Sequence, residues 1–227
     1  MTQAQWIAEE EIEALFLMTT ADYDQDQFLS IGKAVKAVLP DSVQLVANTS
    51  DFDLEYAKKL KQTGFTGAYH IVRLREGTDT EIPKETRIHT LNAIKAAGLD
   101  LYYCVEPIGA EHTYDEIADE MIRARDYNVD VMAIMGRVGV QGTQYENTQP
   151  LSELELTKIA AVTRIVTNPQ KSMCIHEPQT MPLLAGVNQF YAEFGGNPRD
   201  TESSTENHRG FGISEIKRLL CDAGYHI

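Results

Sequence analysis

The regular alternation of strand-like and helix-like segments is the feature that most constrains the fold. Short apolar runs such as 43–48 are separated by longer amphipathic segments such as 25–39, which stops before Pro40. Predicted strands lie at 13–19, 43–48, 66–72, 100–105, 129–135, 171–175 and 187–193, and predicted helices at 25–39, 54–63, 84–97, 114–127, 153–167, 181–185 and 213–223. Because a helix joins each strand to the next, the strands must pair in parallel. The pattern predicts a (β/α)8-type barrel or an open doubly wound sheet.

The length and the first segment favour a barrel that lacks its first strand. The chain has 227 residues, whereas a complete barrel has about 250. It begins with a helix-like segment, QWIAEEEIE, which leads directly into the first predicted strand. We therefore expect residues 1–227 to form a single, incomplete TIM-type barrel of about seven parallel strands, with the last strand and the C-terminal helix in residues 187–227.

Composition excludes several classes of partner. A formal net charge of -14 argues against nucleic acid and against an anionic membrane surface. No apolar run is long enough to span a bilayer, and the N-terminus carries acids where a signal peptide carries Lys or Arg, so we expect a cytoplasmic protein. Cys104, Cys174 and Cys221 are too far apart for a disulfide framework or a local metal site. A small-molecule substrate is the expected partner, and the oligomeric state is left open.

Polar residues gather where the predicted strands end. In parallel barrels these carboxyl ends carry the chemistry. The residues are Thr19, Thr20, Asp22, Asn48, Thr49, Asp51, Asp53, Arg73, Arg75, Glu76, Glu106, Arg137, His176, Glu177, Glu193, Asn197, Arg199 and Asp200. They predict a polar rim that binds a ligand, although solvated loops have the same composition.

Some of these residues have a specific chemical interpretation. The planar fork of Arg73 or Arg75 suits a carboxylate or phosphate, and the Glu76 carboxylate suits ribose hydroxyls; a salt bridge that ties down a loop is the alternative. Glu106 is placed to act as a general base or a substrate anchor, or else to make a turn contact. A lyase that uses Glu106 with His112 ranks last, because no lysine at a strand end is available for a Schiff base. We predict no metal ligand among these residues.

Seven segments in order carry a resemblance to a known family. They are TTADYD, NTSDFDLEYAKKLKQTGFTGAYH, RLREGTD, TRIHTLNAIKAAGL, VEPIGAEHT, GRVGVQGT and HEPQTMPLLAGVNQFYAEFGGNPRDT. The series resembles the radical S-adenosylmethionine (SAM) enzymes of the biotin synthase type, which include the iron-iron hydrogenase maturase and methylornithine synthase, and it covers nearly the whole chain. The segment AEFGGNPRDTE is most similar to the branch that makes the methanogen [Fe]-hydrogenase cofactor.

The resemblance implies an enzyme of cofactor or small-molecule biosynthesis. Such an enzyme cleaves SAM reductively and abstracts hydrogen from a small substrate. By similarity, the SAM-binding residues are Thr19, Thr20, Asp22, Arg73 or Arg75, Glu76 and Arg87. Arg137 faces the substrate, with Glu106 beside it, and these two are the candidate catalytic residues.

The chain departs from the family at the iron-sulfur cluster. Family members carry three cysteines in one loop, which bind a [4Fe-4S] cluster. These 227 residues contain no such loop, so we expect the chain as given to be inactive in that chemistry. One interpretation is the C-terminal part of a longer enzyme, whose missing N-terminal segment holds the cluster. The alternative is a natural short relative that binds SAM or another small ligand without catalysis.

Overall fold

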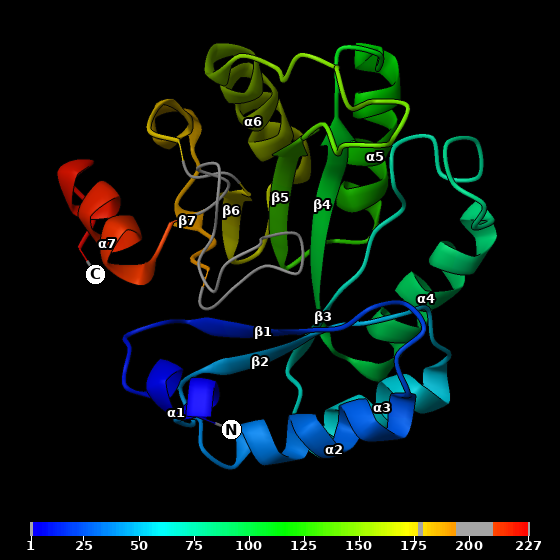
Figure 1. The fold of residues 1–227 in the computed structure, drawn as a ribbon, viewed down its shortest axis with the longest axis vertical. Helices are drawn as coiled ribbons and strands as arrows, with labels where there is room; N and C mark the ends of the chain where they lie inside the picture. The colour runs from blue at the N-terminus through cyan, green and yellow to red at the C-terminus, as the bar shows by residue number, and fades with distance from the viewer. Residues whose placement is uncertain (1, 177–178, 194–210, 227) are drawn as a thin grey trace. The chain divides into compact units, whose positions relative to one another are not determined.

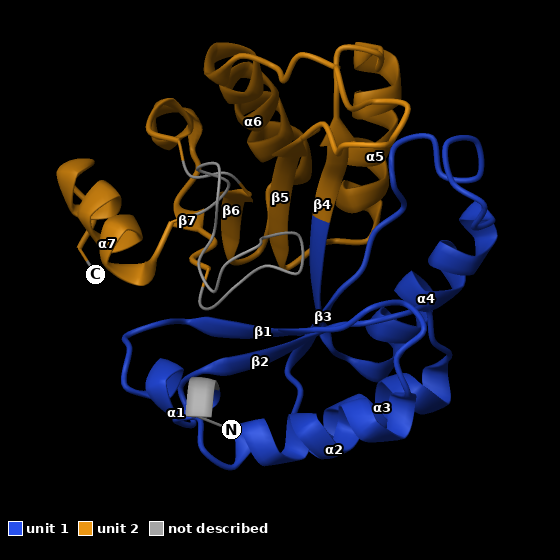
Figure 2. Cartoon of the chain, viewed as in Figure 1, with its two compact units in different colours: residues 1–103 blue, residues 104–227 orange. Residues whose placement is uncertain are grey.

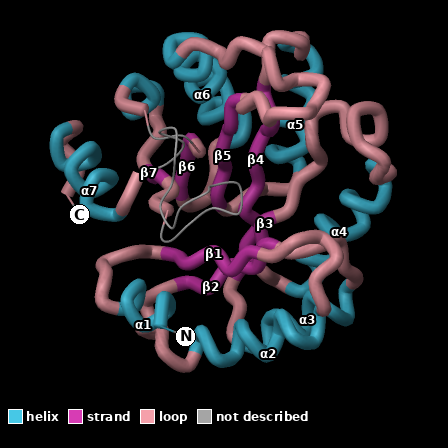
Figure 3. The backbone as a smooth tube through the Cα atoms, in the orientation of Figure 1, coloured by secondary structure: helices cyan, strands magenta, loops and turns pink. Residues whose placement is uncertain are grey.

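A computed structural model describes residues 2–176, 179–193 and 211–226 (Figure 1). Its strands are β1 (Ala14–Met18), β2 (Gln44–Asn48), β3 (Gly67–Tyr69), β4 (Asp100–Ile108), β5 (Val131–Gly136), β6 (Ser172–Ile175) and β7 (Gln189–Phe190). Its helices are α1 (Thr2–Ala8), α2 (Gln25–Lys36), α3 (Leu54–Thr63), α4 (Lys84–Ala97), α5 (Tyr114–Asp126), α6 (Glu153–Thr167) and α7 (Ile213–Asp222), with a 3-10 helix at Met181–Ala185. Figure 3 shows that helices and strands alternate along the chain, as the sequence predicts.

The strands of the described residues form one parallel sheet in the order β1-β2-β3-β4-β5-β6-β7. An open doubly wound sheet would reverse its strand order part-way across, and this sheet does not. A sequential parallel order with helical connections is the order of a TIM-type barrel. The prediction of a barrel fold with seven of its eight strands is therefore confirmed.

The chain divides into two compact units at residue 103, within β4 (Figure 2). In the first unit, residues 1–103, helices α2 and α3 lie along the same side of β1 and β2 (Figure 1). Phe28 of α2 stacks on Phe65 with 5.4 Å between the ring centroids, and both side chains are buried. This aromatic pair packs α2 against the segment that leads into β3.

The second unit, residues 104–227, contains most of β4 and the strands β5 to β7. Helix α6 packs on β5 and on α5. Its buried face includes Ile159 and Ala160, and β5 contributes the fully buried Met132 and Ile134. No helix in the described ranges has both the length and the apolar character needed to cross a membrane.

Strand lengths are where the sequence prediction was wrong. The strand predicted at 66–72 is only three residues long, and that predicted at 187–193 only two. Beyond β3 the His70 amide still donates to the Tyr102 carbonyl, but the Val72 amide donates to the Tyr103 hydroxyl instead of a backbone carbonyl. The chain thus leaves the sheet earlier than its apolar run indicates, since strand length depends on backbone partners that hydropathy does not encode.

Candidate functional site

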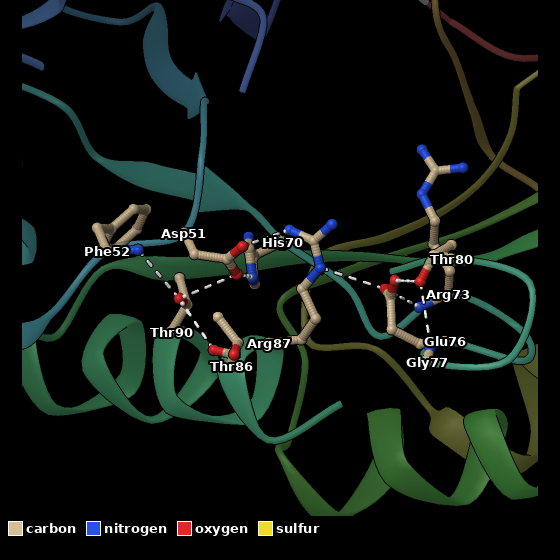
Figure 4. Close-up of polar contacts among 10 residues, drawn as sticks. All are labelled: Asp51, Phe52, His70, Arg73, Glu76, Gly77, Thr80, Thr86, Arg87 and Thr90. Atoms are coloured by element: carbon tan, nitrogen blue, oxygen red, sulfur yellow. Dashed lines mark hydrogen bonds and ion pairs between the residues drawn. The ribbon is translucent and has the colours of Figure 1, made fainter. Parts of the chain in front are cut away.

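The loops after β2 and β3 and the first turns of α4 bring six polar residues together in the first unit (Figure 4). We call this group the Arg87 cluster, and its members are Asp51, His70, Glu76, Thr80, Arg87 and Thr90. Arg87 and Thr90 are three positions apart on α4, so they lie on the same face of that helix. The cluster therefore forms where β2 and β3 end, as barrel architecture leads one to expect.

Arg87 is held between two carboxylates. Its Nε lies 3.2 Å from Glu76 Oε2, and its Nη1 lies 2.8 Å from Asp51 Oδ2. The Arg87 side chain is only 15% exposed, so these charges are partly shielded from water. Within the described residues, Nη2 has no hydrogen-bond partner. The guanidinium is thus fixed on two sides while one nitrogen remains available to a ligand.

The two carboxylates are themselves held in place. The Glu76 side chain is fully buried and accepts hydrogen bonds from the Arg73 amide at 3.1 Å and from the Thr80 hydroxyl. Asp51 Oδ1 lies 3.0 Å from Nε2 of the buried His70 and 3.4 Å from the Thr90 hydroxyl oxygen. Figure 4 shows Arg87 between these two anchored acids.

The protonation states follow from burial and charge. Burial lowers the pKa of His70 below its usual value and outweighs the opposing effect of Asp51, so His70 is neutral at pH 7. Burial tends to raise the pKa of Asp51, but the contacts with His70 and Arg87 outweigh it and lower that pKa. With His70 neutral, two carboxylates and one guanidinium leave the cluster with a formal charge of -1. Such a site favours a ligand that carries positive charge.

The structure brings together only some of the residues predicted to bind SAM. Glu76 and Arg87 are in contact, and Arg73 joins them through its backbone amide, while its side chain points away from Arg87 (Figure 4). Arg75 has a left-handed backbone with φ of 57°. The described hydrogen bonds of Arg87 go to Glu76 and Asp51.

The residues after β1 that are predicted to bind SAM make their described contacts outside the Arg87 cluster. The Thr19 hydroxyl donates to Thr49 Oγ1 at 3.2 Å. Thr20 and Asp22 are exposed, and a hydrogen bond from Thr20 lowers the pKa of Asp22. None of the three makes a described hydrogen bond to Arg87.

A surface hollow of about 430 Å³ lies beside the cluster. Its lining consists of Asp51, Phe52, Glu85, Thr86, His89 and Thr90. It exposes Asp51 and the first turns of α4 to solvent, but neither Arg87 nor Glu76 lines it.

The second unit contains a separate polar group around Arg137. Arg137 Nε lies 2.5 Å from Glu111 Oε1, and its guanidinium carbon lies 4.0 Å from the centre of the Tyr145 ring. Glu111 also lies 3.3 Å from Nδ1 of His112, whose side chain is fully buried. Burial tends to raise the pKa of Glu111, but a backbone hydrogen bond and Arg137 outweigh it and lower that pKa. Glu106 is 4% exposed and lies inside β4, two positions before its end at Ile108, because the strand is longer than the predicted 100–105.

The chain has similar proteins among curated sequences and among solved structures. No family profile matches the sequence. Biotin synthase from Carboxydothermus hydrogenoformans is 25% identical over 183 residues, which is 75% of this chain and 55% of that protein. The crystal structure of methylornithine synthase (PylB) superposes with a TM-score of 0.80 at 15% identity, covering 98% of this chain and 71% of that one. The iron-iron hydrogenase maturase HydG from Carboxydothermus hydrogenoformans gives 0.77 at 17% identity, covering 99% and 57%.

The chain is similar to biotin synthases in sequence and to PylB and HydG in fold. The resemblance drawn from the seven segments is thus confirmed. The chain spans about half the length of its curated biotin synthase relative, 55%. The structural matches, at 15% and 17% identity, establish the fold.

The residues of this chain fit one of the two cofactors that the resemblance implies, which are SAM and a [4Fe-4S] cluster. The Arg87 cluster suits SAM, because an available guanidinium nitrogen matches its carboxylate and a net negative charge matches its sulfonium. A [4Fe-4S] cluster does not fit. Cys104 and Cys174 are buried, Cys221 is exposed on α7, and the described residues contain no metal-binding group of three His, Cys, Asp or Glu.

Four residues of the Arg87 cluster received no specific role from the sequence, namely Asp51, His70, Thr80 and Thr90. Asp51 belongs to the predicted polar rim, but its contact with Arg87 depends on the chain folding back over a separation of 36 positions. His70 was missed altogether, since a single histidine after an apolar run is not diagnostic. Its position directly after Ala68 and Tyr69 is the only signal that places it at a strand end.

Proposed function

We propose that the chain binds SAM through the Arg87 cluster and is part of a radical SAM enzyme of cofactor or small-molecule biosynthesis. The observation that carries the proposal is Arg87, fixed by Glu76 and Asp51 with Nη2 still available, in a chain similar to biotin synthases. In this role Arg87 binds the SAM carboxylate, and Glu76 orients Arg87. Thr19, Thr20 and Asp22 would lie near the SAM amine.

When bound, SAM supplies the group that abstracts hydrogen after reductive cleavage. The contribution of these residues is to bind and orient it. A charge-assisted contact from a fixed guanidinium limits rotation of the methionyl part of SAM, which keeps the sulfonium in one orientation. The partial burial of Arg87 strengthens the contact, because little water competes for it.

The Arg137 group is our proposed substrate contact. Glu111 fixes Nε of Arg137, and Tyr145 lies against the face of the guanidinium. Within the described residues neither Nη1 nor Nη2 of Arg137 has a hydrogen-bond partner, so this edge is available to an anionic substrate group. The buried Glu106 is the proposed second contact from the end of β4.

Calorimetry on the purified chain tests the SAM proposal. We expect SAM to bind, and Arg87→Met to weaken binding at least about tenfold, because a charged hydrogen bond contributes roughly 1.5–3 kcal/mol. The matched control is Arg123→Met, which removes an arginine paired with Glu120 on α5 at 2.8 Å. The control variant should bind SAM as the wild type does. A folded wild-type chain that gives no heat with SAM contradicts the proposal.

The alternative function is a barrel that binds SAM without catalysis. The burial of Cys104 and Cys174 favours it, because these thiols are not placed to hold iron at an open loop. The coding sequence upstream of Met1 separates the two functions. Three closely spaced cysteines encoded there in the same reading frame would support part of a radical SAM enzyme, whereas an intact stop codon upstream would support the binding barrel.

A further inference from the structure

Asp51 contacts three other members of the Arg87 cluster, and the proposed function gives it no role. It follows β2 and touches Arg87 and Thr90 of α4 and His70 after β3. We propose that Asp51 is a positioning residue, which fixes the plane of the Arg87 guanidinium so that Nη2 faces the SAM carboxylate. This inference rests on the proposed binding of SAM by Arg87.

Two attachment points are needed to fix a guanidinium plane. Glu76 holds Nε, which lies next to the flexible stem of the side chain. With that contact alone, the outer nitrogens can still rotate about the Nε end. Asp51 holds Nη1 on the outer part of the group at 2.8 Å, and this second contact sets the direction of Nη2.

Asp51 can fix Arg87 only because its own carboxylate is fixed. His70 is 4% exposed and Thr90 is 1% exposed, so neither partner can easily move away from Asp51. The Thr90 hydroxyl is tied in turn by the Phe52 amide at 3.1 Å. A chain of contacts thus runs from the backbone after β2 through α4 to Arg87, in the way that supporting residues orient a ligand contact.

The experiment compares two ligands on Asp51→Asn, a variant of nearly the same shape without the charge. SAM carries the carboxylate that Arg87 would bind, whereas 5'-methylthioadenosine lacks the whole amino-acid part. We expect calorimetry to show SAM binding weakened about tenfold and 5'-methylthioadenosine binding unchanged.

A double variant gives a second test. Asp51→Asn combined with Arg87→Met should bind SAM no more weakly than Arg87→Met alone, because both changes remove the same interaction with the SAM carboxylate. The control is Asp126→Asn, which removes an exposed acid paired with Arg125 on α5.

Each other outcome overturns the inference in a recognisable way. Equal weakening of both ligands, or additive losses in the double variant, shows a general effect on the fold instead of positioning. Unchanged SAM binding in Asp51→Asn removes the role of Asp51 but leaves the proposed function standing. Absence of SAM binding by the wild type removes both. If Asp51→Asn does not fold, Thr90→Val replaces it. We then expect a smaller loss of affinity for SAM and none for 5'-methylthioadenosine. An equal loss of affinity for both ligands would overturn the proposal.

Discussion

Glu76 is a residue whose role in stability can be separated from its role in binding. Its side chain is fully buried and meets three donors, the Arg73 amide, the Thr80 hydroxyl and Arg87 Nε. Glu76→Gln removes the buried charge that pairs with Arg87 and replaces one acceptor oxygen with an NH2 group. We expect the free energy of unfolding to fall by about 2 kcal/mol, because a hydrogen bond to a charged group contributes roughly 1.5–3 kcal/mol. Urea denaturation measures the change.

An exposed glutamate provides the comparison. Glu55 pairs with Lys58 at 2.7 Å, but its side chain is 74% exposed. Glu55→Gln should change the free energy of unfolding by less than about 0.5 kcal/mol, because water screens surface ion pairs. Equal effects of the two substitutions would show that the buried contacts of Glu76 contribute nothing specific.

The His70 and Asp51 pair predicts how stability depends on pH. The pKa of His70 is lowered from 6.5 in the folded chain, so as pH falls below 6.5 the unfolded chain takes up a proton first and the fold loses stability. The pKa of Asp51 is also lowered, and its contribution is lost only as pH falls further, below 3.8. Urea denaturation at about pH 7 and pH 5 should therefore show a decrease that His70→Gln reduces. An identical decrease in wild type and variant would contradict the assignment to His70.

How far the site could be predicted differs from residue to residue. The resemblance gave Glu76 and Arg87, and the structure places them in contact. Asp51 and His70 meet only when β2 and β3 lie side by side, so no local spacing encodes their contact. Arg75, adjacent to Glu76 in sequence, has a positive φ that the apolar run before it does not predict.

At the scale of single elements, helices were predicted better than strands. The ranges Leu54–Thr63, Lys84–Ala97 and Glu153–Thr167 agree with the prediction at both ends. Their ends are encoded locally, for example by Gly64 and Gly98, which take positive φ after α3 and α4. Strand ends depend on partners in other segments, which is why the apolar run at 66–72 yields only a three-residue β3.

Gly67 in β3 gives a prediction at the same scale. A Cβ at this position would come within 2.7 Å of the Tyr102 ring and 3.0 Å of the Asp100 carbonyl oxygen. Gly67→Ala should therefore lower the free energy of unfolding by about 1–3 kcal/mol, the usual cost of overpacking a core. Thermal and urea denaturation measure it. The control is Gly212→Ala, where the nearest heavy atom is 3.8 Å away; a Gly67→Ala chain as stable as this control would contradict the close contact.

At the scale of the whole molecule, the proposed SAM site and the proposed substrate site lie in different compact units. The Arg87 cluster is built entirely from residues 1–103, and the Arg137 group entirely from residues 104–227. We therefore expect substitutions in one unit to weaken the proposed SAM binding without affecting the proposed substrate binding, and the reverse for the other unit. This separation makes the location of the SAM site measurable without any assay of activity.

Hydrogen exchange followed by mass spectrometry tests that location in the intact chain. SAM should slow amide exchange in the loop from His70 to Pro83 and in the first turns of α4, because binding at Arg87 makes local opening less favourable. Exchange in α5 and α6 should not change. The control is Arg87→Met with SAM, in which the protection should be lost. Protection confined to the second unit would place the SAM site outside the Arg87 cluster, since a ligand slows exchange most where it adds contacts.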